Sequence, residues 1–147
     1  NKITCASWQD IWLNEGFATY LDGLVTEKFD GDESFAGWRK YLNGEITSIP
    51  SGSVFVTDTT SVSRIFNSRL SYRKGAMVLH MLRYKLGDED FFSGLRSYLQ
   101  DPELAYNYAA TPDLIRHLEQ ASGEDLEEFF KDWIYGQGYP TYEVICR

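Results

Sequence analysis

W-L-N-E-G-F-A-T-Y, residues 12–20, places the carboxylate of Glu15 in a run that is otherwise mostly apolar or aromatic. A charged group is costly to remove from water unless it is paired, hydrogen-bonded or bound to a metal. The stretch belongs to a longer pattern in which apolar residues recur every three or four positions, at Leu13, Phe17, Leu21 and Leu24. This spacing predicts an amphipathic helix from residue 8 or 9 to about residue 29, and Glu15 falls on a neighbouring stripe of that helix together with Asp22. The question is then which cation Glu15 faces.

Further helices are predicted along the rest of the chain from apolar spacing and from residues that start or stop helices. The first two cover residues 34–43 and residues 72–86, the latter with Ser71 as cap and Gly87 as stop. The others cover residues 88–99, residues 111–123 with Thr111 as cap and Pro112 in the first turn, and residues 125–135 ending at Gly136. Residues 44–69 are rich in Ser, Thr and Val and contain a proline, which predicts a long irregular segment.

The fold class predicted from this order is mainly all-α. Residues 1–140 are expected to form one helical lobe. Residues 141–147 alternate like a short β-strand, and they have no partner strand in the sequence pattern. They are therefore predicted to start a following β segment or domain.

Composition limits the possible functions. A chain of 147 residues with 43% hydrophobic residues is long enough for one domain with a sizeable core. A formal net charge of -8 argues against a nucleic-acid surface, which needs clustered Lys and Arg. No apolar run has the length of a transmembrane segment. Cys5 and Cys146 lie near opposite ends, where a disulfide is possible but a buried thiol is favoured. The N-terminus lacks the apolar central region of a signal peptide. The missing first methionine indicates a piece of a longer or processed polypeptide, and the cellular compartment stays open.

Taken alone, Glu15 is a weak indication of a metal site, because catalytic zinc needs three protein ligands and one open position. His80 and His117 are the only histidines, and they are not spaced as a ligand pair. Each lies in a predicted amphipathic helix, so a hydrogen-bonded structural role is favoured for both.

A second motif, Y-R-K-G at residues 72–75, precedes the apolar run at residues 76–82. Together, W-L-N-E-G-F-A-T-Y and Y-R-K-G resemble the two signatures of the aminopeptidase N family of gluzincin zinc aminopeptidases. The resemblance extends to I-T-C at residues 3–5, to G-A-M-V-L-H-M-L-R after Tyr72, and to F-F-K-D-W-I and G-Y-P near the end. It covers essentially the whole chain.

This resemblance implies the helical C-terminal lobe of a thermolysin-like zinc metallopeptidase catalytic domain. It implies that Glu15 is the third zinc ligand and that the hydroxyl of Tyr72 stabilises the tetrahedral oxyanion. The substrate of the full-length enzyme would be a peptide, hydrolysed at its N-terminal bond by metal-activated water. The cofactor would be zinc.

Two elements of the family pattern are missing from the 147 residues. There is no H-E-x-x-H, which supplies two histidine ligands and the general base, and no G-x-M-E-N, which anchors the free amine of the substrate. The chain is therefore expected to begin just after the H-E-x-x-H helix and to need the rest of the catalytic domain as its partner. On its own it is expected to be inactive and to lack zinc.

Other residues are candidates for supporting roles. Asn14 precedes the ligand and is expected to help orient it. Asp22, two turns along the same stripe, could accept a hydrogen bond from a ligand histidine, although a solvated carboxylate is the simpler interpretation. Asn67 and Arg69 could line the substrate cleft. For Lys74 and Gly75 of the second motif, a surface charge and close helix packing are the simpler interpretations.

Three alternatives stay open. The first is a non-catalytic all-α interaction domain that retains the fold only. The second is a metal-independent hydrolase that uses Glu15 with Asp22 or another acid. The third is an endopeptidase or epoxide hydrolase on the same scaffold.

Overall fold

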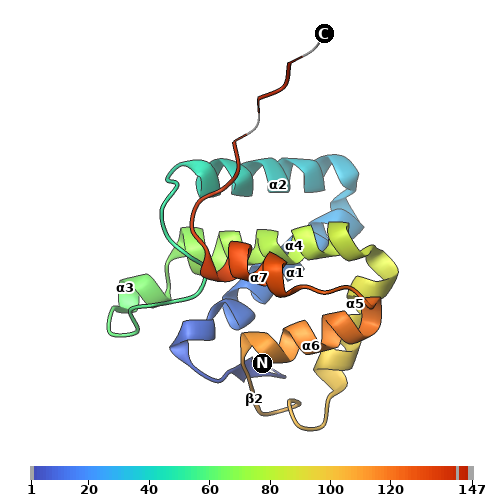
Figure 1. Cartoon of the computed structure of the whole chain (residues 1–147). Helices are drawn as coiled ribbons and strands as arrows, with labels where there is room; N and C mark the ends of the chain where they lie inside the picture. Colours follow the sequence, from blue (N-terminus) through green and yellow to red (C-terminus); the bar gives the residue numbers. More distant parts are fainter. Residues whose placement is uncertain (1, 142, 146–147) are drawn as a thin grey trace.

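A computed structural model describes residues 2–141 and 143–145, which form a bundle of helices (Figure 1). The longer helices in this part of the chain are α1 (Trp12–Asp30), α2 (Asp32–Thr47), α4 (Gly75–Leu86), α5 (Asp88–Gln100) and α6 (Thr111–Ser122). The shorter elements are the 3-10 helix η1 (Trp8–Asp10), the helices α3 (Val62–Ile65) and α7 (Glu127–Phe130), and the π-helices η2 (Ser68–Lys74) and η3 (Lys131–Tyr135). The mainly all-α prediction is confirmed.

Helix α4 lies at the centre of the bundle. It packs against α1, α2, α5, η2 and η3, and α5 packs in turn on α6 (Figure 1). The core between these helices contains large side chains that are at most 1% exposed: Trp12, Tyr20, Leu79, Leu82, Phe91, Leu114, Leu118 and Phe130. Burying such a side chain contributes roughly 1.5–3 kcal/mol. The core therefore holds α1, which carries Glu15, firmly against α4.

Helix α2 is longer than predicted. It continues to Thr47, so the irregular segment predicted for residues 44–69 starts later, and it also contains the short helix α3. Leu42 and Ile46 are both buried and lie one turn apart, so the apolar side of the helix continues past residue 43. Burial of Ile46 thus outweighs the low helix propensity of Gly44, which is about 1 kcal/mol less favourable than alanine.

The segment of residues 48–61 is held in place by two arginines. Arg64 donates hydrogen bonds to the carbonyl oxygens of Ser53 (2.7 Å) and Phe55 (3.0 Å). Arg69 donates to those of Ile49 (2.9 Å) and Ser51 (2.7 Å). Backbone carbonyls outside regular structure need donors, and these two guanidinium groups supply them.

The predicted helix stops at Gly87 and Gly123 are confirmed. Gly87 has φ +81° and Gly123 has φ +72°, backbone conformations that side chains disfavour. The start of α6 differs in detail, because Ala110 rather than Thr111 takes the cap position. Its N–H donates to the Asp113 carboxylate (2.9 Å), which leaves the Thr111 hydroxyl for a longer-range contact.

A short parallel pairing of β1 (Thr4–Cys5) with β2 (Tyr108–Ala109) was not predicted. The predicted strand at residues 141–147 is not formed among the described residues, since Thr141 and residues 143–145 have no regular secondary structure. They extend away from the helices (Figure 1), where no strand is available for pairing. Residues 142, 146 and 147 lie outside the described part. The predicted domain boundary after residue 140 stays a prediction.

Cys5 lies half-buried in β1, and burial raises the pKa of its thiol. Its possible disulfide partner Cys146 is outside the described residues. Within residues 2–141 and 143–145, none of the helices is both long and apolar enough to cross a membrane.

A relay of hydrogen bonds ties the segment before α1 to the start of α6. The indole N–H of Trp12 donates to the Thr111 hydroxyl (2.9 Å), and that hydroxyl donates to the Asp10 carboxylate (2.6 Å). The backbone N–H of Thr111 also points at this carboxylate (3.3 Å). All three residues are buried, with Asp10 only 7% exposed. Thr111 therefore satisfies two buried polar groups at once.

Replacing Thr111 with valine is expected to lower the free energy of unfolding by about 2–4 kcal/mol, because the Trp12 N–H and the Asp10 carboxylate both lose a partner. Urea denaturation measures this change. Thr47→Val is the matched control, since its exposed hydroxyl bonds only to the Asn43 carbonyl, and it should change stability by less than about 0.5 kcal/mol. Equal effects for the two substitutions would contradict the role given to the relay.

Candidate metal and catalytic site

Glu15 and Tyr72 come from two elements that pack against each other, α1 and η2. Glu15 lies in the first turn of α1, and Tyr72 lies within η2. Both residues are half-buried. Burial raises the pKa of Tyr72, and the nearby negative charge of Glu15 raises it further. The fold thus brings together the two residues that the sequence analysis selected for the site.

The residues present fit one part of a zinc site. In the described part of the chain, no Lys, Arg or His forms an ion pair with the Glu15 carboxylate. No group of three His, Cys, Asp or Glu side chains in the same residues could hold a metal ion. Glu15 can therefore supply a single carboxylate ligand from a rigid helix, and the remaining ligands of a zinc ion must come from elsewhere.

The helix that carries Tyr72 begins at a different residue from the one predicted. Asn67, not Ser71, takes the cap position, and its side-chain oxygen accepts from the N–H groups of Arg69 (3.1 Å) and Leu70 (3.0 Å). The Ser71 hydroxyl is buried and donates to the Ile65 carbonyl (2.8 Å). The seven residues of η2 form a π-helix, a feature that often marks functional sites. Tyr72 is therefore held in the interior of an element rather than at its start.

Lys74, expected to be a surface charge, is buried instead, at 4% exposed. Its ammonium group donates to the Gly138 carbonyl (3.4 Å). Burial lowers the pKa of Lys74, and the positive charge of Arg69 lowers it further. The lysine of the Y-R-K-G motif thus ties η2 to the G-Y-P segment near the end of the chain.

Asn14 connects the start of α1 to β1. Its side-chain oxygen accepts from the Cys5 N–H (3.0 Å), and its amide group donates to the Thr4 hydroxyl (3.1 Å). Asn14 thus fixes the segment that leads into the Glu15 helix. A direct effect on the Glu15 carboxylate stays a prediction.

Asn67 and Arg69, the two candidates for the substrate cleft, have structural contacts. The Asn67 side chain caps η2, and the Arg69 guanidinium group binds the carbonyls of residues 49 and 51. A contact with substrate stays a prediction for both.

Asp22 is exposed on α1. It lies seven residues after Glu15, and a rise of about 1.5 Å per residue separates their Cα atoms by roughly 10 Å along the helix. Two carboxylates that act as an acid–base pair lie about 5–9.5 Å apart. Side chains can bring two carboxylates closer together than their Cα atoms, so a metal-independent hydrolase that uses Glu15 with Asp22 stays an open alternative.

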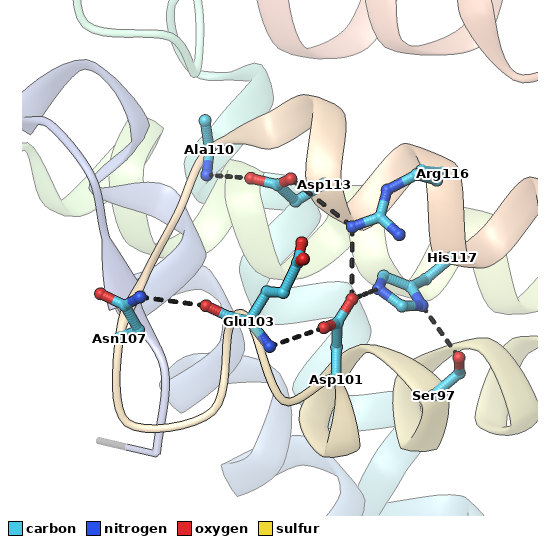
Figure 2. Close-up of polar contacts among 8 residues, drawn as sticks. All are labelled: Ser97, Asp101, Glu103, Asn107, Ala110, Asp113, Arg116 and His117. Atoms are coloured by element: carbon cyan, nitrogen blue, oxygen red, sulfur yellow. Dashed lines mark hydrogen bonds and ion pairs between the residues drawn. The ribbon is translucent and has the colours of Figure 1, made fainter.

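His117 has the hydrogen-bonded structural surroundings expected of it, whereas the buried Nδ1 of His80 has no hydrogen-bond partner among the described residues. His80 packs edge-on against Phe35, with ring centroids 5.4 Å apart, and burial lowers the pKa of its imidazole. His117 is 4% exposed, and both of its ring nitrogens are in hydrogen bonds (Figure 2): Nδ1 with the Ser97 hydroxyl and Nε2 with the Asp101 carboxylate, each 2.9 Å. Neither nitrogen of His117 is therefore left for a metal ion.

One hydrogen-bonded cluster contains the residue types of a hydrolase catalytic triad, namely Ser97, His117 and Asp101. Its position in the fold differs from that of a catalytic triad. Ser97 lies inside α5, where backbone N–H groups are used within the helix and cannot form an oxyanion hole. Arg116 also pairs with Asp101 (3.3 Å), as Figure 2 shows. The cluster joins α6 to the end of α5 and has a structural role.

A hollow beside the N-terminal segment was not predicted. It has a volume of about 650 Å³ and is lined by residues of β1 and η1 together with Asn14, Thr59 and Tyr108. Neither Glu15 nor Tyr72 lines it. Trp8, which lines the hollow, is exposed and packs edge-on against Phe66.

Comparison with known proteins assigns the same family as the motifs. The model of the Peptidase family M1 domain matches residues 1–133. Aminopeptidase M1 of Arabidopsis thaliana is 38% identical over an alignment that covers 100% of this chain and 17% of the relative. Aminopeptidase N of Lactococcus lactis is 32% identical, covering 96% of this chain and 17% of that protein. The chain thus spans less than a fifth of the length of these relatives.

Solved structures agree with the sequence comparison. The M1 zinc metallopeptidase from Deinococcus radiodurans superposes with a TM-score of 0.80 at 29% sequence identity, covering 95% of this chain and 30% of that structure. A mutant of that peptidase was solved bound to a Tyr-Ser-Ala substrate. The helical bundle described above therefore resembles one part of that M1 zinc metallopeptidase.

Proposed function

Because the chain belongs to peptidase family M1, we propose that it forms the helical lobe of a zinc-dependent aminopeptidase catalytic domain. Glu15 is the third zinc ligand in this proposal, and Tyr72 stabilises the oxyanion. The observation that carries the proposal is the packing of α1 against η2, which brings the Glu15 carboxylate near enough to raise the pKa of the Tyr72 phenol.

Glu15 suits the role of ligand because its position is fixed. The first turn of α1 is anchored by the buried Trp12 and by the Asn14 contacts with β1. A ligand on a rigid element can be held within the narrow tolerances that catalysis needs. Zinc, when bound, would polarise both a water molecule and the scissile carbonyl.

Tyr72 suits the role of oxyanion donor because its hydroxyl keeps its proton. Burial and the charge of Glu15 both raise the pKa of the phenol, so the group stays a hydrogen-bond donor at neutral pH. A donor aimed at developing negative charge stabilises a transition state by a few kcal/mol. Serine or threonine would be too short to reach the same position, and phenylalanine has no donor.

The substrate would be a peptide with a free N-terminus, and the products a single amino acid and a shortened peptide. The elements that recognise the amine and activate water in this family, G-x-M-E-N and H-E-x-x-H, do not occur in the 147 residues. The rest of the catalytic domain is therefore the partner of this lobe.

The full-length polypeptide is expected to release N-terminal residues from peptides, and a zinc chelator should stop the reaction. The 147 residues alone should show no chelator-sensitive turnover, because one carboxylate cannot replace three ligands. The release of amino acids from an aminoacyl 4-nitroanilide measures the turnover of the full-length polypeptide and of the isolated 147 residues.

Three outcomes would contradict the proposal. Turnover by the isolated chain would show that the other ligands are not needed. Turnover of the full-length protein that survives a chelator would indicate metal-independent hydrolysis. A full-length protein that neither binds zinc nor turns over substrate would indicate a non-catalytic interaction domain.

A further inference from the structure

Helices α1 and α4 cross at two glycines, Gly16 and Gly75, with almost no space between the backbones. A Cβ atom placed on Gly16 would lie 2.9 Å from the carbonyl carbon of Gly75 and 3.1 Å from its Cα. A Cβ atom placed on Gly75 would lie 3.2 Å from the Cα of Gly16. Both glycines are buried. What each side chain would meet is mainly backbone, which cannot move aside as a flexible side chain can.

Neither glycine is needed for its backbone conformation. Gly16 lies inside α1, and Gly75 is helical with φ -56° and ψ -45°, a conformation open to any residue. Glycine inside a helix is about 1 kcal/mol less favourable than alanine. The benefit that offsets this loss at both positions is the close approach of the two helices.

The crossing lies next to the proposed catalytic groups. Gly16 directly follows Glu15, and Gly75 follows Tyr72 by three residues, close to one helical turn. Because η2 continues directly into α4, Tyr72 lies on the same continuous helical segment as Gly75, so a shift of the crossing is transmitted to Tyr72. The same few residues thus carry both the chemistry and the contact that sets its spacing.

We propose that Gly16 and Gly75 are positioning residues, whose helix crossing sets the separation between the Glu15 carboxylate and the Tyr72 hydroxyl. The proposal rests on the function proposed above for these two groups. Catalysis is sensitive to such spacing, since a displacement of about 1 Å at the reacting groups can lower the rate by roughly 100-fold.

The chain offers a matched control in Gly94. A Cβ atom on Gly94 would lie 2.9 Å from Cδ2 of Leu118, 3.1 Å from its Cα and 3.2 Å from the His117 carbonyl oxygen. Gly94→Ala therefore crowds a helix crossing to a similar degree, but between α5 and α6, which carry neither Glu15 nor Tyr72.

The experiment compares three variants of the full-length polypeptide, Gly16→Ala, Gly75→Ala and Gly94→Ala. For each variant it measures zinc affinity, kcat, KM and the unfolding midpoint. All three are expected to lower the midpoint. Only the first two should lower kcat at saturating zinc, by about 100-fold with little change in KM. They should also weaken zinc binding, measured by chelator competition, by about 10-fold, as when the support of a ligand is disturbed. Gly75→Ala introduces the less severe steric clash, so it tests the proposal even if the Gly16→Ala variant does not fold.

Equal losses of kcat and zinc affinity in all three variants would overturn the proposal, because general destabilisation would then explain them. Unchanged kcat and zinc affinity in Gly75→Ala would also overturn it. Glu15→Ala and Tyr72→Phe separate this failure from failure of the proposed function. If those two variants lose activity while the Gly16 and Gly75 variants behave like Gly94→Ala, only the positioning role is wrong.

Discussion

If the proposed function holds, replacing Glu15 with alanine in the full-length polypeptide is expected to release the zinc ion and to reduce turnover to the level of the metal-free protein. In the proposed zinc site one of three protein ligands would be lost, and alanine has no oxygen atom that could take its place. Loss of a hydrogen-bonding partner of a ligand costs 10–100-fold in affinity, so loss of the ligand itself should exceed about 100-fold. Metal content after gel filtration and chelator competition measure the change.

Asp22→Asn is the matched control, because Asp22 is an exposed carboxylate on the same stripe of the same helix. It should change zinc affinity at most modestly. If Glu15→Ala keeps both its zinc and its turnover, the assignment of Glu15 as a ligand is wrong. If Asp22→Asn abolishes turnover while zinc stays bound, a second carboxylate takes part in the reaction.

Replacing Tyr72 with phenylalanine is expected to lower kcat by about 100- to 1,000-fold, which corresponds to about 2.7–4 kcal/mol of transition-state stabilisation. The ring and its packing are kept and only the donor is lost, so KM should change little and zinc content not at all. Steady-state kinetics at saturating zinc separate kcat from KM.

Tyr84→Phe provides the comparison, because Tyr84 is 90% exposed on α4 and should leave the kinetics unchanged. A Tyr72→Phe variant with normal kcat and raised KM would show that the hydroxyl binds substrate rather than the transition state. Loss of zinc from the same variant would show that the phenol supports the metal site instead.

Much of the fold could be predicted because its signals are local. Apolar spacing around Leu13 and Phe17 indicated the long first helix, and Gly87 and Gly123 marked the ends of two others. The errors arose where a distant contact overrides a local preference. Helix α2 passes through Gly44 because Ile46 is buried by packing with other helices, which the pattern of residues 34–43 alone does not reveal.

The candidate site, too, could be predicted only in part. The motifs identified Glu15 and Tyr72, and the structure places them on adjoining elements. The sequence did not reveal how Tyr72 is held, since Ser71 was expected to start its helix and instead bonds to Ile65 from a buried position. Lys74 was expected at the surface, but its carbonyl partner, Gly138, lies 64 residues further along the chain.

The sequence by itself determined most of the helices and the stops at Gly87 and Gly123, because these depend on neighbours within one or two turns. Glu15 and Tyr72 stand out in it through the resemblance of their motifs to those of a zinc peptidase family. The tertiary structure decided how closely α1 approaches α4, which backbone Gly16 touches, and which carboxylate Thr111 bonds across the fold. Those contacts join residues far apart in the chain. Their geometry follows from packing the whole core at once, and no local pattern encodes it.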